Sequence, residues 1–274
     1  MRKIFIFRST KLVIGVIILF LLIGSSLVGS CLSKWGPYYM QDGYELKPPS
    51  KTNFLGTDEF GRDLLARVLY GIRISLTVGI LSVMMGGIVG NLIGWISGYL
   101  GGIIDDIFMR FVDAILAYPA ILVGIAVAAV LGPGYFNTAI AVAFVNMPRF
   151  ARLSRSITLS ERERDYVKAA KSLGNSSFRT LFYHIVPNTF SPILVQMANS
   201  MAAATLLEAG LGFLGLGAQP PMPSLGSLLR SSLIYMSEVP GYAIFPGIVL
   251  TLLIFSLNII SEGARDLYDP KYIK

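Results

Sequence analysis

The sequence predicts an all-α membrane protein, a polytopic helix bundle with six transmembrane helices. Of its 274 residues, 54% are hydrophobic and 14% are charged, and the mean hydropathy is +0.64. Soluble domains carry about 25% charged residues. Several apolar runs approach the roughly 20 residues that a helix needs to cross the hydrocarbon core of a bilayer. Most of the chain is therefore expected to lie in a membrane.

The apolar runs and the basic residues together predict the topology. If the N-terminus is cytoplasmic, 16 of the 23 Lys and Arg residues fall on the cytoplasmic side, in agreement with the positive-inside rule. Both termini are then cytoplasmic. This placement accounts for the net charge of +7, so no nucleic-acid partner is expected. The predicted spans are residues 12–32, 74–98, 105–131, 137–157, 188–215 and 243–262.

The first span is expected to remain as an anchor. Basic residues before an apolar run are also typical of a signal peptide, and residues 28–31 resemble a weak lipoprotein cleavage site. The run from Leu12 to Leu32 is 21 residues long, however, whereas signal-peptide cores have about 7–15. We expect an anchor helix with an external loop (1–73), a membrane core (74–262) and a cytoplasmic tail (263–274).

Two short amphipathic stretches are expected outside the membrane. In the first, residues 56–76, one helical face is apolar, which predicts a helix along the outer interface. This helix is either an elbow that leads into the second span or a docking element for an external partner. Residues 225–236 have similar spacing and are too short and polar to span. The apolar residues of the first face are Leu64, Leu65, Val68, Leu69 and Ile72.

Charged residues mark the start of the third span. Asp106, Arg110 and Asp113 share one helical face, so Arg110 can pair within its own helix. The alternative is a contact between this face and a cytoplasmic segment. Pro119 is expected to kink the span, because proline removes one backbone hydrogen bond.

Polar residues make the fifth span the least lipid-like. Gln196 and Asn199 lie along one side among Ala, Ser and Gly residues that allow close helix packing. We expect protein around this helix and interpret both amides as candidate residues of a translocation pathway. Glu208, near the outer end, either reaches interfacial water or a structural partner, or holds a gate.

A polar insert interrupts the apolar spans at residues 158–187. Strong helix formers fill 160–172, and Ser160 and Glu163 have capping-box spacing. Gly174 suits the left-handed position after a helix. A second short helical run follows, and Pro187 is expected to end it. The sequence thus predicts a helix–glycine–helix elbow on the cytoplasmic side.

This elbow is expected to carry small Ala169 and Ala170 on its surface, a shape that fits a groove in a partner. The stretch "KAAKSLGNSSFRTLFYHIVP" resembles the EAA loop of ABC-importer permeases. Ala169, Ala170, Gly174 and Pro187 match that pattern, and Lys168 stands where the family has its usual Glu. The resemblance implies that these five residues couple the chain to an ATPase.

Further stretches narrow the resemblance. "FLGTDEFGRDLLARVLYGIRISL", "MRFVDAILAYPAILVGI", "FLGLGAQPPMPSLGSLL" and the C-terminal "GARDLYDP" resemble the dipeptide, oligopeptide and nickel permeases, specifically the second of their paired subunits. The resemblance implies the type I ABC-importer permease fold. Its implied partners are a second homologous permease, two ABC ATPase subunits and an external substrate-binding protein, in a prokaryotic plasma (inner) membrane.

Other functional classes lack their motifs. The chain has one cysteine, Cys31, and one histidine, His184, which is too few for a disulfide framework or a protein-only zinc site. No HExxH motif occurs, and Gly210-x-Gly212-x-x-Gly215 has no preceding strand. A membrane enzyme and a secondary transporter with internal repeats are therefore disfavoured.

The sequence also bears on energy supply and substrate. It contains no Gly-Lys dipeptide, hence no Walker A motif. The chain is expected to hold no cofactor and no metal, with ATP and Mg bound by the partner ATPases. Peptides are the favoured substrate because Gln196 and Asn199 are neutral and no His or Cys lines a predicted pathway. Nickel or a metal chelate, carried by related permeases, remains the alternative.

Overall fold

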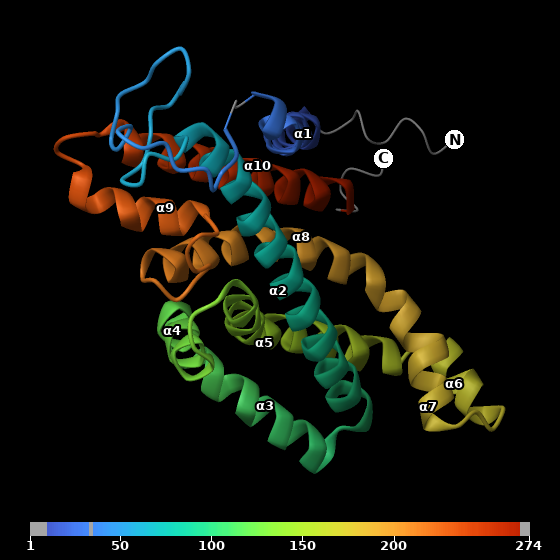
Figure 1. Cartoon of the computed structure of the whole chain (residues 1–274). Coiled ribbons are helices and arrows are strands. Elements are labelled where there is room, and N and C mark those ends of the chain that lie inside the picture. Colours follow the sequence, from blue (N-terminus) through green and yellow to red (C-terminus); the bar gives the residue numbers. More distant parts are fainter. Residues whose placement is uncertain (1–9, 33–34, 269–274) are drawn as a thin grey trace.

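The computed structural model describes residues 10–32 and 35–268, which form helices joined by loops (Figure 1). No strand occurs in these ranges, only an isolated bridge between Thr57 and Asp63. The long helices are α1 (Thr10–Leu32), α2 (Leu64–Leu100), α5 (Tyr135–Arg162), α8 (Val186–Phe213) and α10 (Gly241–Tyr268). The shorter helices are α3 (Gly102–Leu116), α4 (Ala120–Leu131), α6 (Asp165–Ser172), α7 (Ser177–Arg179), a π-helical segment η2 (Thr180–Ile185), α9 (Leu225–Ser232) and a 3₁₀ segment η3 (Leu233–Tyr235).

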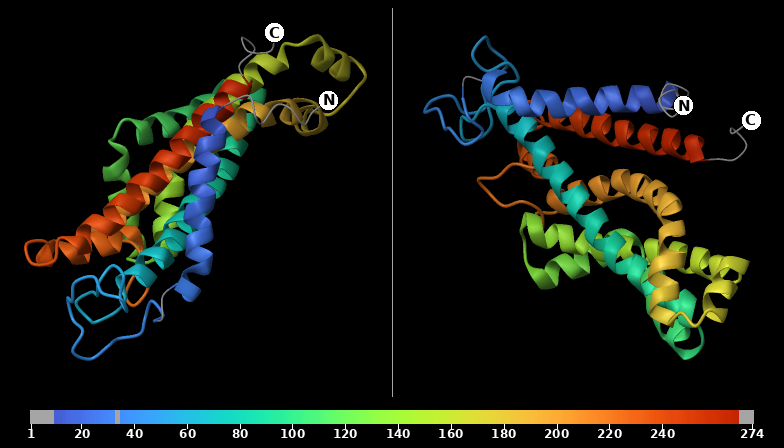
Figure 2. Two further views of the ribbon diagram at one scale, coloured as in Figure 1. Left: turned by 90° about the horizontal axis from the view of Figure 1, so that it is seen from above. Right: turned by 90° about the vertical axis from the view of Figure 1, so that its right-hand side faces the viewer.

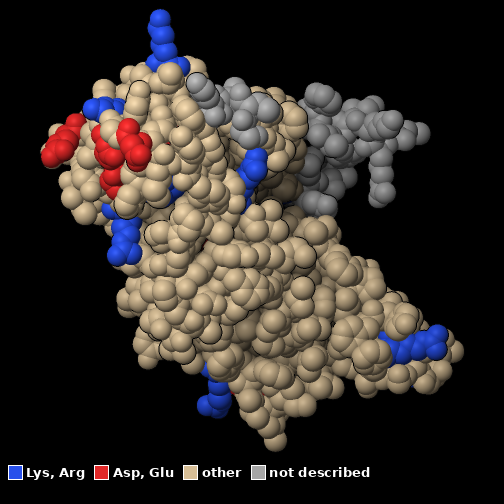
Figure 3. Space-filling view, viewed as in Figure 1, with Lys and Arg blue, Asp and Glu red and all other residues tan. Residues whose placement is uncertain are grey.

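The predicted helical membrane bundle is confirmed, but the count of six spans is not exact. By length and apolarity, four described helical runs can cross a membrane: α1, α2, the run from α7 to α8, and α10. The bent pair of α3 and α4 raises the number to five. Helix α5 has 28 residues but is not among them, because arginines and asparagines interrupt its apolar residues. On the face drawn in Figure 3, a broad area without charged side chains covers the middle of the molecule.

Helices α1 and α10 pack side by side in opposite directions (Figure 2). Glycines allow the close approach, since a Cβ on Gly263 would lie 2.6 Å from Leu12 Cβ and one on Gly15 would lie 2.8 Å from Ile260. Lys11 and Glu262 form an ion pair of 3.1 Å at one end. The two ends of the described chain therefore lie on the same side of the bundle, as the predicted topology requires.

A row of glycines joins α2 to α5. Gly86, Gly90, Gly94 and Gly98 recur at every fourth position, and a Cβ on Gly90 or Gly94 would lie 2.3 Å from a carbonyl oxygen of α5. Small residues at this spacing let two helix backbones approach closely. At the same interface Ser154 of α5 donates a hydrogen bond of 2.6 Å to Asn91 of α2. These two helices form the most extensive contact in the bundle.

The third predicted span is broken rather than merely kinked. Helix α3 ends before Pro119, α4 begins after it, and the two axes differ by 99°. The predicted pairing of Arg110 within its own helix is wrong. Asp113 instead lies 2.6 Å from Arg152 of α5, so the charges at the start of this span join neighbouring helices.

The loop between α1 and α2 leads directly into α2, and its described residues (35–63) contain no separate interfacial helix. Leu64, Val68, Leu69 and Ile72 belong to α2 and are buried in a cluster with residues of α9 and α10. Asp63 caps α2 by accepting a hydrogen bond from the Ala66 amide. The apolar face that predicted an interfacial helix is thus a packing face inside the bundle.

Buried charges hold the loop between α1 and α2 against α2. Asp58 has its carboxylate 2.6 Å from Arg62 and 3.0 Å from Arg67, and all three side chains are buried. Tyr242 of α10 donates a hydrogen bond to Glu59 of the same loop. A network of this kind fixes the loop to the ends of two helices. Helix α9 is the short helix predicted at 225–236, although it ends at Ser232 and a 3₁₀ segment follows it.

Candidate functional site

The insert between α5 and α8 is an elbow, although its boundaries differ from those predicted. Helix α5 runs on through Ser160 to Arg162, and α6 begins at Asp165 with no side-chain cap. The predicted capping box of Ser160 and Glu163 is therefore wrong. The apolar and polar faces of α5 continue past Ser160 as far as Arg162 before the chain turns, which was not apparent from the sequence.

Gly174 occupies the predicted left-handed position. Its φ is +80°, and its amide donates to the Lys171 carbonyl at 3.0 Å. The next amide, that of Asn175, donates to the Ala170 carbonyl at 3.2 Å. These two bonds are the Schellman pattern that closes a helix at glycine. The turn after α6 therefore depends on a residue that tolerates positive φ.

The two alanines of the elbow face in different directions. Ala169 and Lys168 are exposed, but Ala170 is only 5% exposed. The prediction of Ala170 on the surface is therefore wrong. Helix α6 is amphipathic, and Val167 and Ala170 form its inner face, close to a buried cluster around Tyr99 and Ile185.

Large apolar side chains, rather than small ones alone, form the outer surface of the elbow. The side chain of Leu173 is 85% exposed, and those of Phe178 and Tyr183 are 68% and 72% exposed. Leu173 directly follows α6, Phe178 lies in α7 and Tyr183 lies in the π segment. Together we call these three side chains the apolar ridge. An exposed ridge of this kind is typical of a surface that another protein covers.

A hydrogen-bond chain ties the elbow to the helices on both sides. Tyr166 of α6 donates to Glu161 of α5 at 2.7 Å and accepts from Asn188 of α8 at 3.1 Å. Burial and the Glu161 carboxylate raise the pKa of Tyr166. Arg164 lies 3.0 Å from Glu161. Motion of α6 would thus be passed to α5 and α8 together.

Pro187 was predicted to end the second helical run, and this prediction is wrong. The residue lies within the run. The chain is helical from Ser177 to Phe213, with a π-helical segment directly before α8. A π turn widens the helix and accommodates a residue that cannot donate a backbone hydrogen bond. Asn188 donates its side-chain amide to the His184 carbonyl at 2.8 Å, which satisfies one backbone acceptor at this site. The elbow is therefore continuous with α8.

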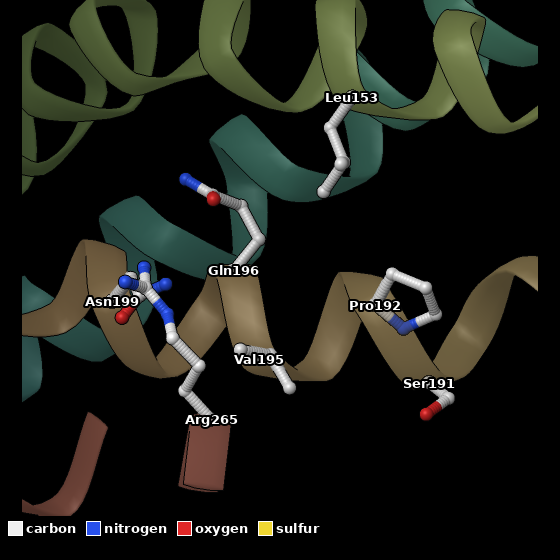
Figure 4. Close-up of a pocket in the computed structure, with 7 residues that line it drawn as sticks. All are labelled: Leu153, Ser191, Pro192, Val195, Gln196, Asn199 and Arg265. Carbon is white, nitrogen blue, oxygen red and sulfur yellow. The ribbon is translucent and has the colours of Figure 1, made fainter. Parts of the chain in front are cut away.

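Both amides predicted for the pathway line one cavity. Gln196 and Asn199 of α8 face a cavity of about 420 Å³ between α5, α8 and α10 (Figure 4). Leu153 of α5 and Val195 of α8 contribute apolar walls. The cavity lies in the half of α8 nearer the elbow. The structure thus places the candidate pathway directly after the candidate coupling element.

Arg265 of α10 also lines this cavity, and sequence reasoning missed it. Figure 4 shows its side chain reaching toward Asn199. Asn199 in turn accepts a hydrogen bond from Ser261, also on α10. No local motif identifies Arg265, because its role depends on how α10 packs against α8.

Glu208 lies far from that cavity, at the other end of α8. It is 1% exposed, so it does not reach interfacial water. The hydroxyl groups of Ser75 in α2 and Ser224 at the start of α9 interact with its carboxylate, while its Oε2 has no hydrogen-bond partner among the described residues. A Cβ on Gly226 would lie 2.3 Å from the Ala209 carbonyl oxygen. Glu208 therefore sits at a tight junction of three helices.

Comparison with known proteins places this architecture in a family. Residues 90–274 match the family described as "Binding-protein-dependent transport system inner membrane component". The chain belongs to this family of membrane transport components. No three His, Cys, Asp or Glu side chains of the described residues gather as they would around a metal ion.

Relatives match nearly the whole chain. It is 42% identical over 226 residues to the dipeptide transport system permease protein DppC of Alkalihalophilus pseudofirmus, covering 82% of this chain and 74% of that protein. It is 37% identical over 263 residues to the di/tripeptide transport system permease protein DppC of Pseudomonas aeruginosa, covering 94% and 87%. The glutathione transport system permease protein GsiD of Pectobacterium atrosepticum is 40% identical over 223 residues, covering 81% and 74%.

Solved structures support the fold. An inward-facing structure of the MetNI methionine ABC transporter aligns with a TM-score of 0.58 at 16% identity, covering 75% of this chain and 97% of that one. At this identity the likeness concerns the fold alone. The predicted type I importer permease fold is thereby confirmed.

Proposed function

We propose that this chain forms one half of the translocation pathway for peptides in an ATP-driven importer. The observation that carries the proposal is the continuity between the elbow and the cavity. Phe178 and Tyr183 of the apolar ridge and the cavity residues Gln196 and Asn199 lie along a single helical run, Ser177–Phe213. A force applied at the ridge would therefore act directly on the cavity.

The same proposal assigns the energy supply to other subunits. ATP and Mg would be bound and hydrolysed by two ABC ATPases that cover the ridge, since this chain has no Gly-Lys dipeptide and hence no Walker A motif. A second, homologous permease would supply the other half of the pathway. An external binding protein would deliver the substrate, as the name of the family indicates.

The orientation follows from the same arrangement. The elbow (158–187) and both termini would be cytoplasmic, and the external loop, α9 and Glu208 would lie toward the outer face. The distribution of 16 basic residues inside against 7 outside supports it. The permease core would comprise residues 74–262, with the anchor and loop before it and the tail after it.

The mechanism would be a two-state switch. Approach of the ATPases would push α6, and the chain from Glu161 through Tyr166 to Asn188 would carry this motion into α5 and α8. At the far end, Glu208 joins α8 to α2 and α9, so that it would hold the outer gate. ATP binding shifts the population between the two states only by its differential affinity for them.

Peptides are proposed as the cargo because the relatives described above are named for dipeptides, di- and tripeptides, and glutathione. The number of these relatives and the share of the chain that each covers favour peptides over nickel as the cargo. The cavity of about 420 Å³ is also within the range of about 300–1,000 Å³ that is typical of small-molecule sites.

Uptake by the reconstituted complex tests this function. The chain would be co-expressed with its permease, ATPase and binding-protein partners and placed in proteoliposomes. The proposal predicts ATP-dependent accumulation of labelled dipeptides and none of nickel. ATP-dependent nickel uptake without peptide uptake would contradict it.

A further inference from the structure

A single unpaired cation reaches the cavity beside α8. Arg265 is the one charged residue among those that line it, and no ion pair of Arg265 occurs in the described part of the chain. The nearby acid Glu262 is held by Lys11 at 3.1 Å. The guanidinium therefore retains its full capacity to donate hydrogen bonds into the cavity.

The amides around Arg265 have complementary orientations. Asn199 accepts the Ser261 hydroxyl through Oδ1, which leaves its Nδ2 free to donate. Gln196 donates through Nε2 to Ser200 at 3.3 Å, which leaves its Oε1 free to accept. The cavity thus offers a cation and an N–H donor together, with a carbonyl acceptor one helical turn away.

This set matches the end of a peptide. A carboxylate is the natural partner of a guanidinium because two N–H groups can reach its two oxygens. The Oε1 of Gln196 could accept the adjacent peptide N–H. Leu153, Pro192 and Val195 give the cavity apolar walls.

We propose that Arg265 binds the C-terminal carboxylate of the peptide cargo in this cavity, before release on the side of the elbow. The proposal rests on the proposed function and deepens it. Asn199 assists by donating to the same carboxylate, and Gln196 holds the peptide backbone. The cavity would therefore bind peptides with a free C-terminus more tightly than peptides that end in an amide.

Photo-cross-linking without the binding protein tests this directly, because the binding protein could impose the same preference. The purified permease–ATPase complex would be placed in nanodiscs of zwitterionic lipid. A photoreactive dipeptide would be cross-linked in the presence of unlabelled dipeptide or its C-terminal amide. In the wild type, the free dipeptide should compete at least tenfold better than the amide.

Matched variants separate the role of Arg265 from a general effect of charge. Arg265→Gln should lose the tenfold preference, and Arg265→Lys should keep part of it. Arg110→Gln, which removes an exposed arginine outside the cavity, should keep all of it. An unchanged preference in Arg265→Gln would overturn the proposal.

The phosphate group of an anionic lipid could bind the Arg265 guanidinium in place of the peptide carboxylate. If anionic lipid added to the nanodiscs abolishes dipeptide cross-linking in the wild type but not in Arg265→Gln, the cavity is a lipid site and the proposal is wrong. If the proposed peptide import itself is wrong, the result is different: the wild-type complex would transport no peptide in proteoliposomes. Peptide uptake with no carboxylate preference at Arg265 would overturn only this inference.

Discussion

Gly94 of α2 lies against Ala151 of α5 so closely that a Cβ on Gly94 would be 2.3 Å from the Ala151 carbonyl oxygen. The contact is with backbone, which cannot rotate away as a side chain can. Gly86, Gly90 and Gly98 make similar contacts with α5, so four successive turns of α2 lie against α5 and the two helices form a rigid pair. This pair runs between the elbow and the end of the bundle where α2 contacts α9.

Gly94→Ala is therefore expected to destabilise the protein, by about 1–3 kcal/mol for an overpacked contact. Gly87→Ala is the matched control, because a Cβ there would meet the Phe150 ring at an ordinary 3.7 Å. Alanine favours a helix over glycine by about 1 kcal/mol, so this control should be neutral or stabilising. Thermal unfolding of the purified complex measures both, and equal melting temperatures would contradict the close packing.

The ion pair between Asp105 and Arg155 supplies a second prediction. Nε of Arg155 lies 2.5 Å from the Asp105 carboxylate and joins α5 to α3. Asp105→Asn should lower the melting temperature, since the pair is partly buried and Arg155 loses its charged partner. Asp106→Asn, at an exposed neighbour, should have little effect. If the two variants melt together, the pair does not hold α3 in place.

Glu208 gives a prediction about the outer gate. Glu208→Gln removes the charge at the junction of α2, α8 and α9 while keeping nearly the same volume. We expect altered peptide uptake, or altered coupling of uptake to ATP hydrolysis, in an assembled complex. Glu238→Gln, at an exposed site near the same end, is the control. Uptake and basal ATPase rates equal to those of the wild type would remove Glu208 from the gate.

Apolar runs predicted the long helices well. Residues 12–32 and 243–262 became α1 and α10 with only small changes at their ends, because the required length and apolarity are local properties. Gly174 was predicted for the same reason, since positive φ after a helix is a local demand. The row from Gly86 to Gly98 was also visible in the sequence as a four-residue repeat, although it was not recognised as the α2–α5 interface.

Tertiary context decided the features that the sequence missed. Pro187 predicted a helix end, but a π turn absorbs its missing donor. The face of Leu64 and Val68 predicted an interfacial helix, whereas α9 and α10 cover it. Arg265 carries no local signal, and it enters the cavity only because α10 lies against α8. Patterns in one helix cannot identify the helix that covers them.

The turn at Gly174 predicts how the elbow responds to substitution. A Cβ there would meet no atom within 4 Å, so any effect comes from the backbone conformation alone. Gly174→Val should weaken ATPase association or abolish substrate-stimulated hydrolysis, because a β-branched residue is strained at positive φ. Gly174→Asn should be much milder, since asparagine tolerates this region. Lys168→Glu, which restores the usual residue of the EAA loop, should be tolerated. Co-purification of the ATPases and their stimulated rates measure all three variants, and normal values for Gly174→Val would argue against coupling through this turn.

The central claim is that the apolar ridge contacts the ATPases. A photo-cross-linking amino acid at position 173 tests it most directly, because Leu173 is 85% exposed and its replacement leaves the packing intact. The control is position 234, since Ile234 is 80% exposed in the 3₁₀ segment that directly follows α9, and Figure 1 shows α9 far from α6 and α7. In membranes that contain the whole complex, illumination should join position 173 to an ATPase subunit and leave position 234 unjoined to it. Capture of the ATPase from position 234, or its absence from position 173, would contradict the account.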